Sequence, residues 1–150
     1  MRHQVLLRKA EYYVNTKRRI RAALYKYMLI KFQNKYAIHI PINCCGKGLR
    51  LMHVGPILMN SKVSIGENCV IHINTAFVAG GTNDDAPTLG DSVIVGVGAV
   101  VLGGVTIAQN VAIGANAVVN KDVLEEDIAV GGVPARKISD RGRTSWNKGQ

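Results

Sequence analysis

Residues 89–124 read LGDSVI VGVGAV VLGGVT IAQNVA IGANAV VNKDVL, which is six segments of six residues each. The first residue of every segment is aliphatic: Leu89, Val95, Val101, Ile107, Ile113 and Val119. A period of six matches neither the turn of an α-helix nor the alternation of a flat strand. It predicts short strands joined by tight corners, with three segments to a coil and each coil packed on the next. We therefore expect a mainly β protein built as a parallel β-helix.

A second motif, Gly131-Gly132-Val133-Pro134-Ala135-Arg136, follows the repeats. Together the two features resemble the hexapeptide-repeat acyltransferases, in particular serine acetyltransferases and the acetyltransferases of polysaccharide gene clusters. The resemblance implies a left-handed coil, assembly as a homotrimer and acetyl-CoA as the acyl donor.

The chain divides into three expected parts. Residues 1–40 form a basic helical segment, because residues 1–36 contain no Pro or Gly. Residues 41–135 form the left-handed β-helix, and residues 136–150 form a polar tail. Within the first part, Asn15 or Thr16 is expected to cap a second helical stretch.

Two interruptions of the repeat are also expected. Val63 and Ser64 shift the phase of the repeat by two residues, which indicates a small bulge or loop. Residues 80–88 are rich in turn-forming residues and predict a loop that leaves a corner of the column.

Positive charge is concentrated in the helical segment. Residues 1–36 hold ten Lys or Arg and a single acidic residue, Glu11, whereas residues 37–150 hold nine basic and nine acidic residues. Five apolar residues fall at helical spacing among these charges: Ile20, Leu24, Tyr27, Met28 and Phe32. We expect this stripe to pack on the β-helix; the alternative is peripheral contact with an anionic membrane surface. No base-reading motif accompanies the charge, so we expect no nucleic-acid partner.

The cysteines indicate the compartment. Cys44, Cys45 and Cys69 are odd in number and lack metal-ligand spacing, which favours a reducing, cytoplasmic setting and buried thiols. No signal peptide is evident at the N-terminus. The uncharged run from Ser92 to Asn120 is long enough to span a bilayer, but its regularly spaced glycines and amides indicate stacked coils instead.

Histidines are the candidate bases, because imidazole titrates near neutral pH. His3 lies in the helical segment and His39 precedes the repeats, which leaves His53 and His72 within the coils. The resemblance assigns His53, in Leu51–Ile57, to the general base of serine acetyltransferases. His72 follows an inward aliphatic residue and is expected to project outward, where it either completes the site or only lines a coil.

The sequence departs from the family pattern at two acceptor positions. Met52 stands where serine acetyltransferases carry an aspartate before the base, and Ala86 stands where they carry a second histidine. Asp84 and Asp85 are candidate substitutes, and Asn74 is a candidate amide partner of His72. These departures weaken the match to L-serine and favour a sugar hydroxyl as the alternative acceptor.

The donor half of the family pattern is retained. In the family, coenzyme A lies along a groove between subunits and contacts the backbone of late coils. The matching positions and the basic residues near the motif end are Gly98, Ala99, Gly114, Ala115, Lys121, Arg136 and Lys137.

The resulting prediction is an acetyl-CoA-dependent O-acetyltransferase that uses direct attack by the acceptor hydroxyl, with no metal and no covalent intermediate. Two other classes remain open. A zinc-dependent β-helix carbonic anhydrase would require three converging histidines, whereas the coils hold two. A non-catalytic trimeric assembly module would keep the repeats without the chemistry.

Overall fold

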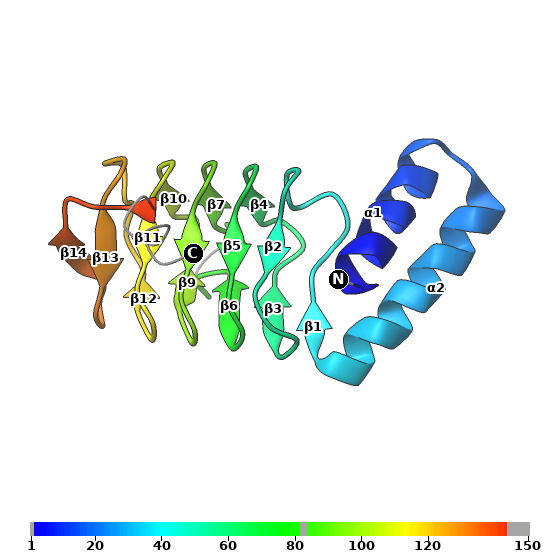
Figure 1. Cartoon of the computed structure of the whole chain (residues 1–150), viewed down its shortest axis with the longest axis horizontal. Coiled ribbons are helices and arrows are strands. Elements are labelled where there is room, and N and C mark those ends of the chain that lie inside the picture. The colour runs from blue at the N-terminus through cyan, green and yellow to red at the C-terminus, as the bar shows by residue number, and fades with distance from the viewer. Residues whose placement is uncertain (1, 82–83, 144–150) are drawn as a thin grey trace.

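The computed structural model describes residues 2–81 and 84–143. Helices α1 (Arg2–Asn15) and α2 (Arg19–Tyr36) form a hairpin at one end of a column of short strands (Figure 1). Thr82 and Asn83 of the expected loop lie outside the described residues, as do residues 144–150 of the expected tail.

The column has three faces, which we name sheets A, B and C. Sheet A contains β1 (Ile38–His39), β3 (Ile57–Met59), β6 (Thr75–Val78), β9 (Val100–Leu102) and β12 (Val118–Val119). Sheet B contains β4 (Ser64–Ile65), β7 (Thr88–Leu89) and β10 (Thr106–Ile107). Sheet C contains β2 (Arg50–Leu51), β5 (Val70–Ile71), β8 (Ile94–Val95), β11 (Ala112–Ile113), β13 (Ala129–Gly131) and β14 (Arg136–Ser139). The chain visits the three faces in turn, so each circuit forms one coil.

Strand register confirms the predicted coil length. Ile94 pairs with Ala112 and Val100 with Val118, both in parallel, so each coil takes eighteen residues or three repeats. Val70 pairs with Ile94, twenty-four residues on, because the connection between β6, which ends at Val78, and β7, which begins at Thr88, is longer than in the later coils. At the far end, β14 runs antiparallel to β13. The residues from Arg136, expected to begin a polar tail, therefore start with a strand.

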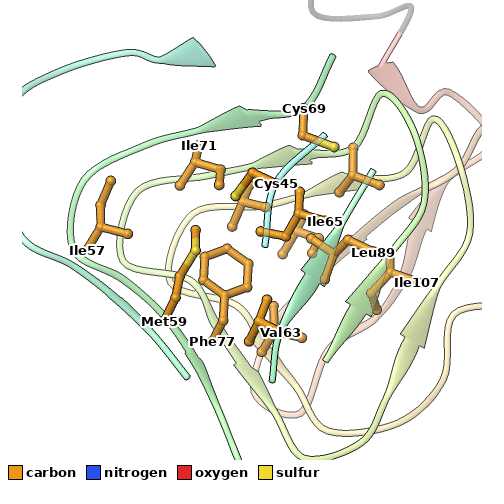
Figure 2. Close-up of a cluster of buried hydrophobic side chains, with 14 of the residues drawn as sticks. Cys45, Ile57, Met59, Val63, Ile65, Cys69, Ile71, Phe77, Leu89 and Ile107 are labelled. Carbon is orange, nitrogen blue, oxygen red and sulfur yellow. The ribbon is translucent and has the colours of Figure 1, made fainter. Parts of the chain in front are cut away.

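Inward side chains from the three faces fill the column. Figure 2 shows Met59 and Phe77 from sheet A meeting Ile65 and Leu89 from sheet B, with Ile71 from sheet C closing the triangle. The six aliphatic residues that head the repeats are all buried, as predicted. The three cysteines are buried free thiols, also as predicted.

The phase shift of two residues occurs one corner earlier than predicted. Met59 pairs with Phe77, and six-residue steps connect Met59, Ile65, Ile71 and Phe77 without interruption. Val63 lies two positions before Ile65, and both side chains point into the column. Val63 therefore does not interrupt the six-residue repeat. The two extra residues lie between Leu51 and Met59, in the corner that carries His53.

Polar side chains attach the hairpin to the first coil. Arg8 pairs with Glu11 at 2.8 Å and donates to the carbonyl oxygen of Cys45, also at 2.8 Å. Glu11 in turn accepts from the backbone N–H of Asn43, and Gln33 donates to the carbonyl of Ile40 at 2.7 Å. These bonds satisfy backbone groups that have no preceding coil to pair with.

The expected cap of the second helix is wrong. α2 begins after Arg18 with no side-chain cap, while the Thr16 hydroxyl donates back to the carbonyl of Tyr12. Asn15 instead bonds to Asn43. The Thr16 side chain therefore stabilises the end of α1, and the Asn15 side chain joins that end to the first coil.

The expectation that the apolar stripe packs on the β-helix is also wrong. Ile20 is 87% exposed, Leu24 54% and Tyr27 58%, and Met28 is exposed as well. Phe32 alone of the stripe packs against the core, where Leu7 and Leu29 make the buried contacts of the hairpin. Within residues 2–81 and 84–143, no helix has both the length and the apolar character needed to cross a membrane.

Candidate active site

The corners that lead from sheet C to sheet A stack into one seam along the column. Met52 donates its backbone N–H to Ile71, His72 donates to Val95, and Gly96 donates to Ile113, at 2.8–3.1 Å. Met52, His72 and Gly96 are therefore equivalent positions on successive coils. The imidazole rings of His53 and His72 lie with centroids 6.2 Å apart.

The position of His72 affects its protonation. The side chain is half-buried, and this burial, together with the nearby His53, lowers the pKa of His72 below the usual value of 6.5. The Thr75 hydroxyl donates to the carbonyl oxygen of His72 at 3.0 Å, which fixes the corner. His72 is therefore predominantly neutral at pH 7 and can accept a proton.

His53 is exposed and faces a cleft of about 590 Å³ between the hairpin and the first coil. The cleft is lined by His3, Gln4, Phe32, Tyr36, Ile38, Leu51, Met52, His53 and Val54. Sequence reasoning missed the helical members of this set. No spacing rule connects residues 3 and 32–36 with residue 53, and only the packing of the hairpin brings them together.

His3 is the third histidine of this region. It is 3% exposed, and burial lowers its pKa to about 4. Its Nε2 lies 3.4 Å from the Gln33 amide nitrogen, and its Nδ1 has no hydrogen-bond partner among the described residues.

The predicted acceptor residues are divided between two corners. Asn74 follows His72 in the same corner, at φ +61°, and borders a separate cleft with His39. Asp84 and Asp85 leave the column at the corner from sheet A to sheet B, where Asp84 pairs with Lys62 at 3.2 Å. These two carboxylates therefore belong to a different corner from the two histidines.

The predicted cofactor residues are also divided. Gly98, Gly114 and Ala115 lie on the same seam as the histidines, on later coils. Ala99 is fully buried and its N–H bonds within the corner, so its side chain belongs to the core instead. Gly98 has φ +73°, and a Cβ there would lie 2.2 Å from the side-chain oxygen of Asn116, so coil stacking itself requires glycine.

Lys121, Arg136 and Lys137 surround a cleft of about 480 Å³ at the far end of the column. Lys137 pairs with Asp140 at 2.6 Å and with Glu125 at 2.5 Å, and these hydrogen bonds raise its pKa. Within the described part of the chain, no group of three or more His, Cys, Asp or Glu side chains could hold a metal ion.

A column of hexapeptide coils, with two imidazoles at the head of a seam of small residues, defines a β-helix scaffold suited to acyl transfer. Residues 86–121 match the family described as bacterial transferase hexapeptide (six repeats). A serine acetyltransferase of Helicobacter pylori is 35% identical over 117 residues, which are 75% of this chain and 67% of that protein. The chain thus belongs to the hexapeptide-repeat acyltransferases related to serine acetyltransferases, and its column is a left-handed parallel β-helix.

Other relatives differ from this chain in length. A serine acetyltransferase of Synechococcus elongatus is 37% identical over 97 residues, covering 62% of this chain and 38% of that protein. A Brucella abortus serine acetyltransferase solved with coenzyme A superposes with a TM-score of 0.74 at 26% identity, covering 91% of this chain and 54% of that one. The present chain therefore spans roughly half or less of these two proteins.

Burial of neutral His3 predicts a specific loss of stability in acid. A histidine whose folded pKa is lowered stabilises the fold fully above its unfolded pKa of 6.5, and this contribution declines as the pH falls towards about 4. We expect this residue to lower the unfolding free energy by about 2 kcal/mol between pH 7.5 and pH 5. Urea unfolding at the two pH values should show that His3→Gln removes this part of the pH dependence. The exposed-site control His39→Gln should retain it, and an unchanged profile in His3→Gln would contradict the assignment.

Proposed function

We propose that this chain catalyses acetyl-CoA-dependent acetylation of a hydroxyl group on a small molecule. The observation that carries the proposal is the His53 and His72 pair, which heads the seam of Gly98, Gly114 and Ala115 and of which His53 borders an open cleft. The Brucella relative with coenzyme A supports the choice of donor. The seam also supports it, because it presents backbone without long side chains.

In the proposed reaction, the acceptor hydroxyl oxygen attacks the thioester carbonyl carbon while His53 takes the hydroxyl proton. Backbone N–H groups stabilise the resulting oxyanion. Collapse of the tetrahedral intermediate breaks the carbon–sulfur bond, and the thiolate takes the proton from His53 to leave as coenzyme A. Because the pKa of His72 is lowered, His72 remains neutral and does not oppose the transient positive charge on His53.

The Lys121, Arg136 and Lys137 cluster lies about three coil spacings from His72, or about 15 Å. An extended carrier on the seam would place its phosphates near this cluster, where Lys121 and Arg136 supply positive charge. Lys137 contributes less, since two carboxylates already neutralise it.

The acceptor is L-serine or a sugar in this proposal. Met52 supplies no carboxylate to orient His53, and Asp84 and Asp85 lie at another corner of the same chain. Both observations favour the sugar hydroxyl of surface-polysaccharide assembly as the alternative to L-serine.

Replacement of the paired histidines should abolish turnover while leaving the fold intact. We expect His53→Ala to lower kcat by about 10²- to 10⁴-fold, because the hydroxyl proton loses its acceptor. Thiol release from acetyl-CoA, measured against L-serine and a panel of sugars, tests this, with His39→Ala as a control that retains activity. Full turnover in a His53→Ala, His72→Ala double variant would exclude the mechanism. Failure of the native protein to bind coenzyme A by calorimetry would favour a non-catalytic assembly module.

We also propose that the chain assembles as a homotrimer through sheet A. The outward residues Leu58, Ala76, Val100 and Val118 pair across successive strands and form an apolar row. The outward residues of sheet B are polar: Ser64, Thr88 and Thr106. An exposed apolar row of this kind is typical of a protein interface. A neighbour on sheet A would lie beside the histidine seam, and the loop with its Asp84 and Asp85 borders the opposite edge of that sheet.

A charge on sheet A should dissociate the trimer. Sedimentation equilibrium is expected to give three times the chain mass of 16.2 kDa for the native protein and a single chain mass for Val100→Glu. The cost arises because a carboxylate would lose water at the interface. Thr106→Glu, on the outward face of sheet B in the same coil, should remain trimeric. A single-chain mass for the native protein would refute the assembly.

We further propose that the hairpin holds the protein on the cytoplasmic side of an anionic membrane. The exposed stripe Ile20, Leu24 and Tyr27 lies on α2, which carries five basic residues and no acidic one: Arg19, Arg21, Lys26, Lys31 and Lys35. Arg8 and the lone acid Glu11 are paired at the first coil. Exposed apolar side chains beside cationic charge attract a helix to an anionic membrane surface. The three free cysteines support a reducing compartment.

Vesicle binding tests this contact. Phosphatidylcholine vesicles containing phosphatidylserine should co-sediment the protein, and vesicles of phosphatidylcholine alone should do so weakly. Leu24→Glu should lower the affinity about tenfold or more, because a buried leucine is lost and a negative charge is gained. Leu124→Glu, an exposed leucine at the far end of the column, is the matched control. Equal binding by both variants would contradict the proposal.

A further inference from the structure

We propose that the cleft between the hairpin and the first coil binds an uncharged sugar ring whose hydroxyl faces His53. This inference rests on the proposed acetyl transfer and names the acceptor class. It assigns His3 and Phe32 as specificity-determining residues, and neither was identified from the sequence.

The cleft has an aromatic wall. Phe32 and Tyr36 lie one turn apart on α2 with ring centroids 4.6 Å apart, and His3 lies 5.9 Å from Phe32. Lys35 Nζ lies 5.4 Å from the Tyr36 ring centroid, whereas among the described residues no such cation lies over the ring of Phe32. The C–H face of a pyranose ring packs on such a surface, because the aromatic face carries partial negative charge.

The lining carries no formal charge. None of the described residues that border the cleft is Asp, Glu, Lys or Arg, and burial keeps His3 neutral at pH 7. Free L-serine carries an ammonium and a carboxylate, both of which lose water on binding and require charged partners. A neutral ring with several hydroxyl groups requires only dipolar partners. The lining therefore favours the sugar over the amino acid.

His3 supplies such a partner. His3 lies on the cleft wall and is only 3% exposed, and its buried Nδ1 has no hydrogen-bond partner among the described residues. A buried polar atom without a partner costs folding free energy, and a ligand hydroxyl would recover that cost on binding. Gln4, whose amide donates to Leu49 at 3.2 Å, provides a second polar group nearby.

The volume of the cleft is compatible with a sugar ring. A cleft of about 590 Å³ lies within the range of small-molecule sites, which bury most of the ligand surface. A glycoside ring fits within this volume with one hydroxyl at the cleft mouth beside His53.

Ligand-observed saturation-transfer NMR on the full chain, with methyl glycosides of glucose, galactose and N-acetylglucosamine and with L-serine, tests the assignment directly. We expect saturation transfer to at least one glycoside and none to L-serine. In the transfer assay, Phe32→Leu should raise the glycoside KM by about tenfold or more while leaving the acetyl-CoA KM unchanged, because it keeps the apolar volume and removes the aromatic face. Tyr27→Leu, an exposed aromatic on the same helix, is the matched control.

His3→Phe separates a ligand contact from a structural role. If His3 Nδ1 awaits a ligand, this variant should bind glycosides more weakly while its thermal midpoint at pH 7.5 does not fall. A lower midpoint with unchanged glycoside binding would overturn the role of His3. Saturation transfer to L-serine and to no glycoside would overturn the acceptor class. Loss of coenzyme A binding would contradict the proposed acetyl transfer but not the sugar site, because glycoside binding is measured without the donor.

Discussion

Each coil of the column is held because its backbone N–H groups donate to carbonyl groups of the next coil, which in the regular coils lies eighteen residues along the chain. This pairing fixes where every corner must fall. It explains the left-handed conformation shared by Asn74, Gly98 and Asn116, since each ends the same turn one coil further on. A side chain at a corner therefore inherits a fixed position relative to the corner above it, and this positions His72 next to the corner of His53.

The candidate site lies where this regularity is relaxed. The corner after Leu51 contains two residues more than its successors, and no earlier coil covers it. The hairpin occupies that open end and contributes His3 and Phe32 to the wall opposite His53. Rigid coils thus hold one imidazole, while the irregular corner presents the other to solvent. Catalytic groups are often placed this way, on loops positioned by a stiff scaffold.

Periodicity predicted most of the fold, because aliphatic residues at a constant interval have few other ways to be buried. The same rule placed His72 directly after the inward-facing Ile71, and the structure has His72 half-buried at a corner. The predictions that failed depended on contacts between segments distant in the sequence. The packing of α2 leaves Ile20 and Leu24 exposed, although their spacing alone suited burial, and no local pattern could show that His3 lies across a cleft from His53.

The hydrogen bonds from Arg8 and Gln33 to the first coil have a consequence for assembly along the axis. A solenoid without its terminal cover presents free strand edges and an apolar cross-section that match the other end of an identical molecule. The hairpin thus caps this end of the column and prevents end-to-end association into fibres. A single chain segment thereby terminates the stack, shapes the pocket and carries the cationic surface.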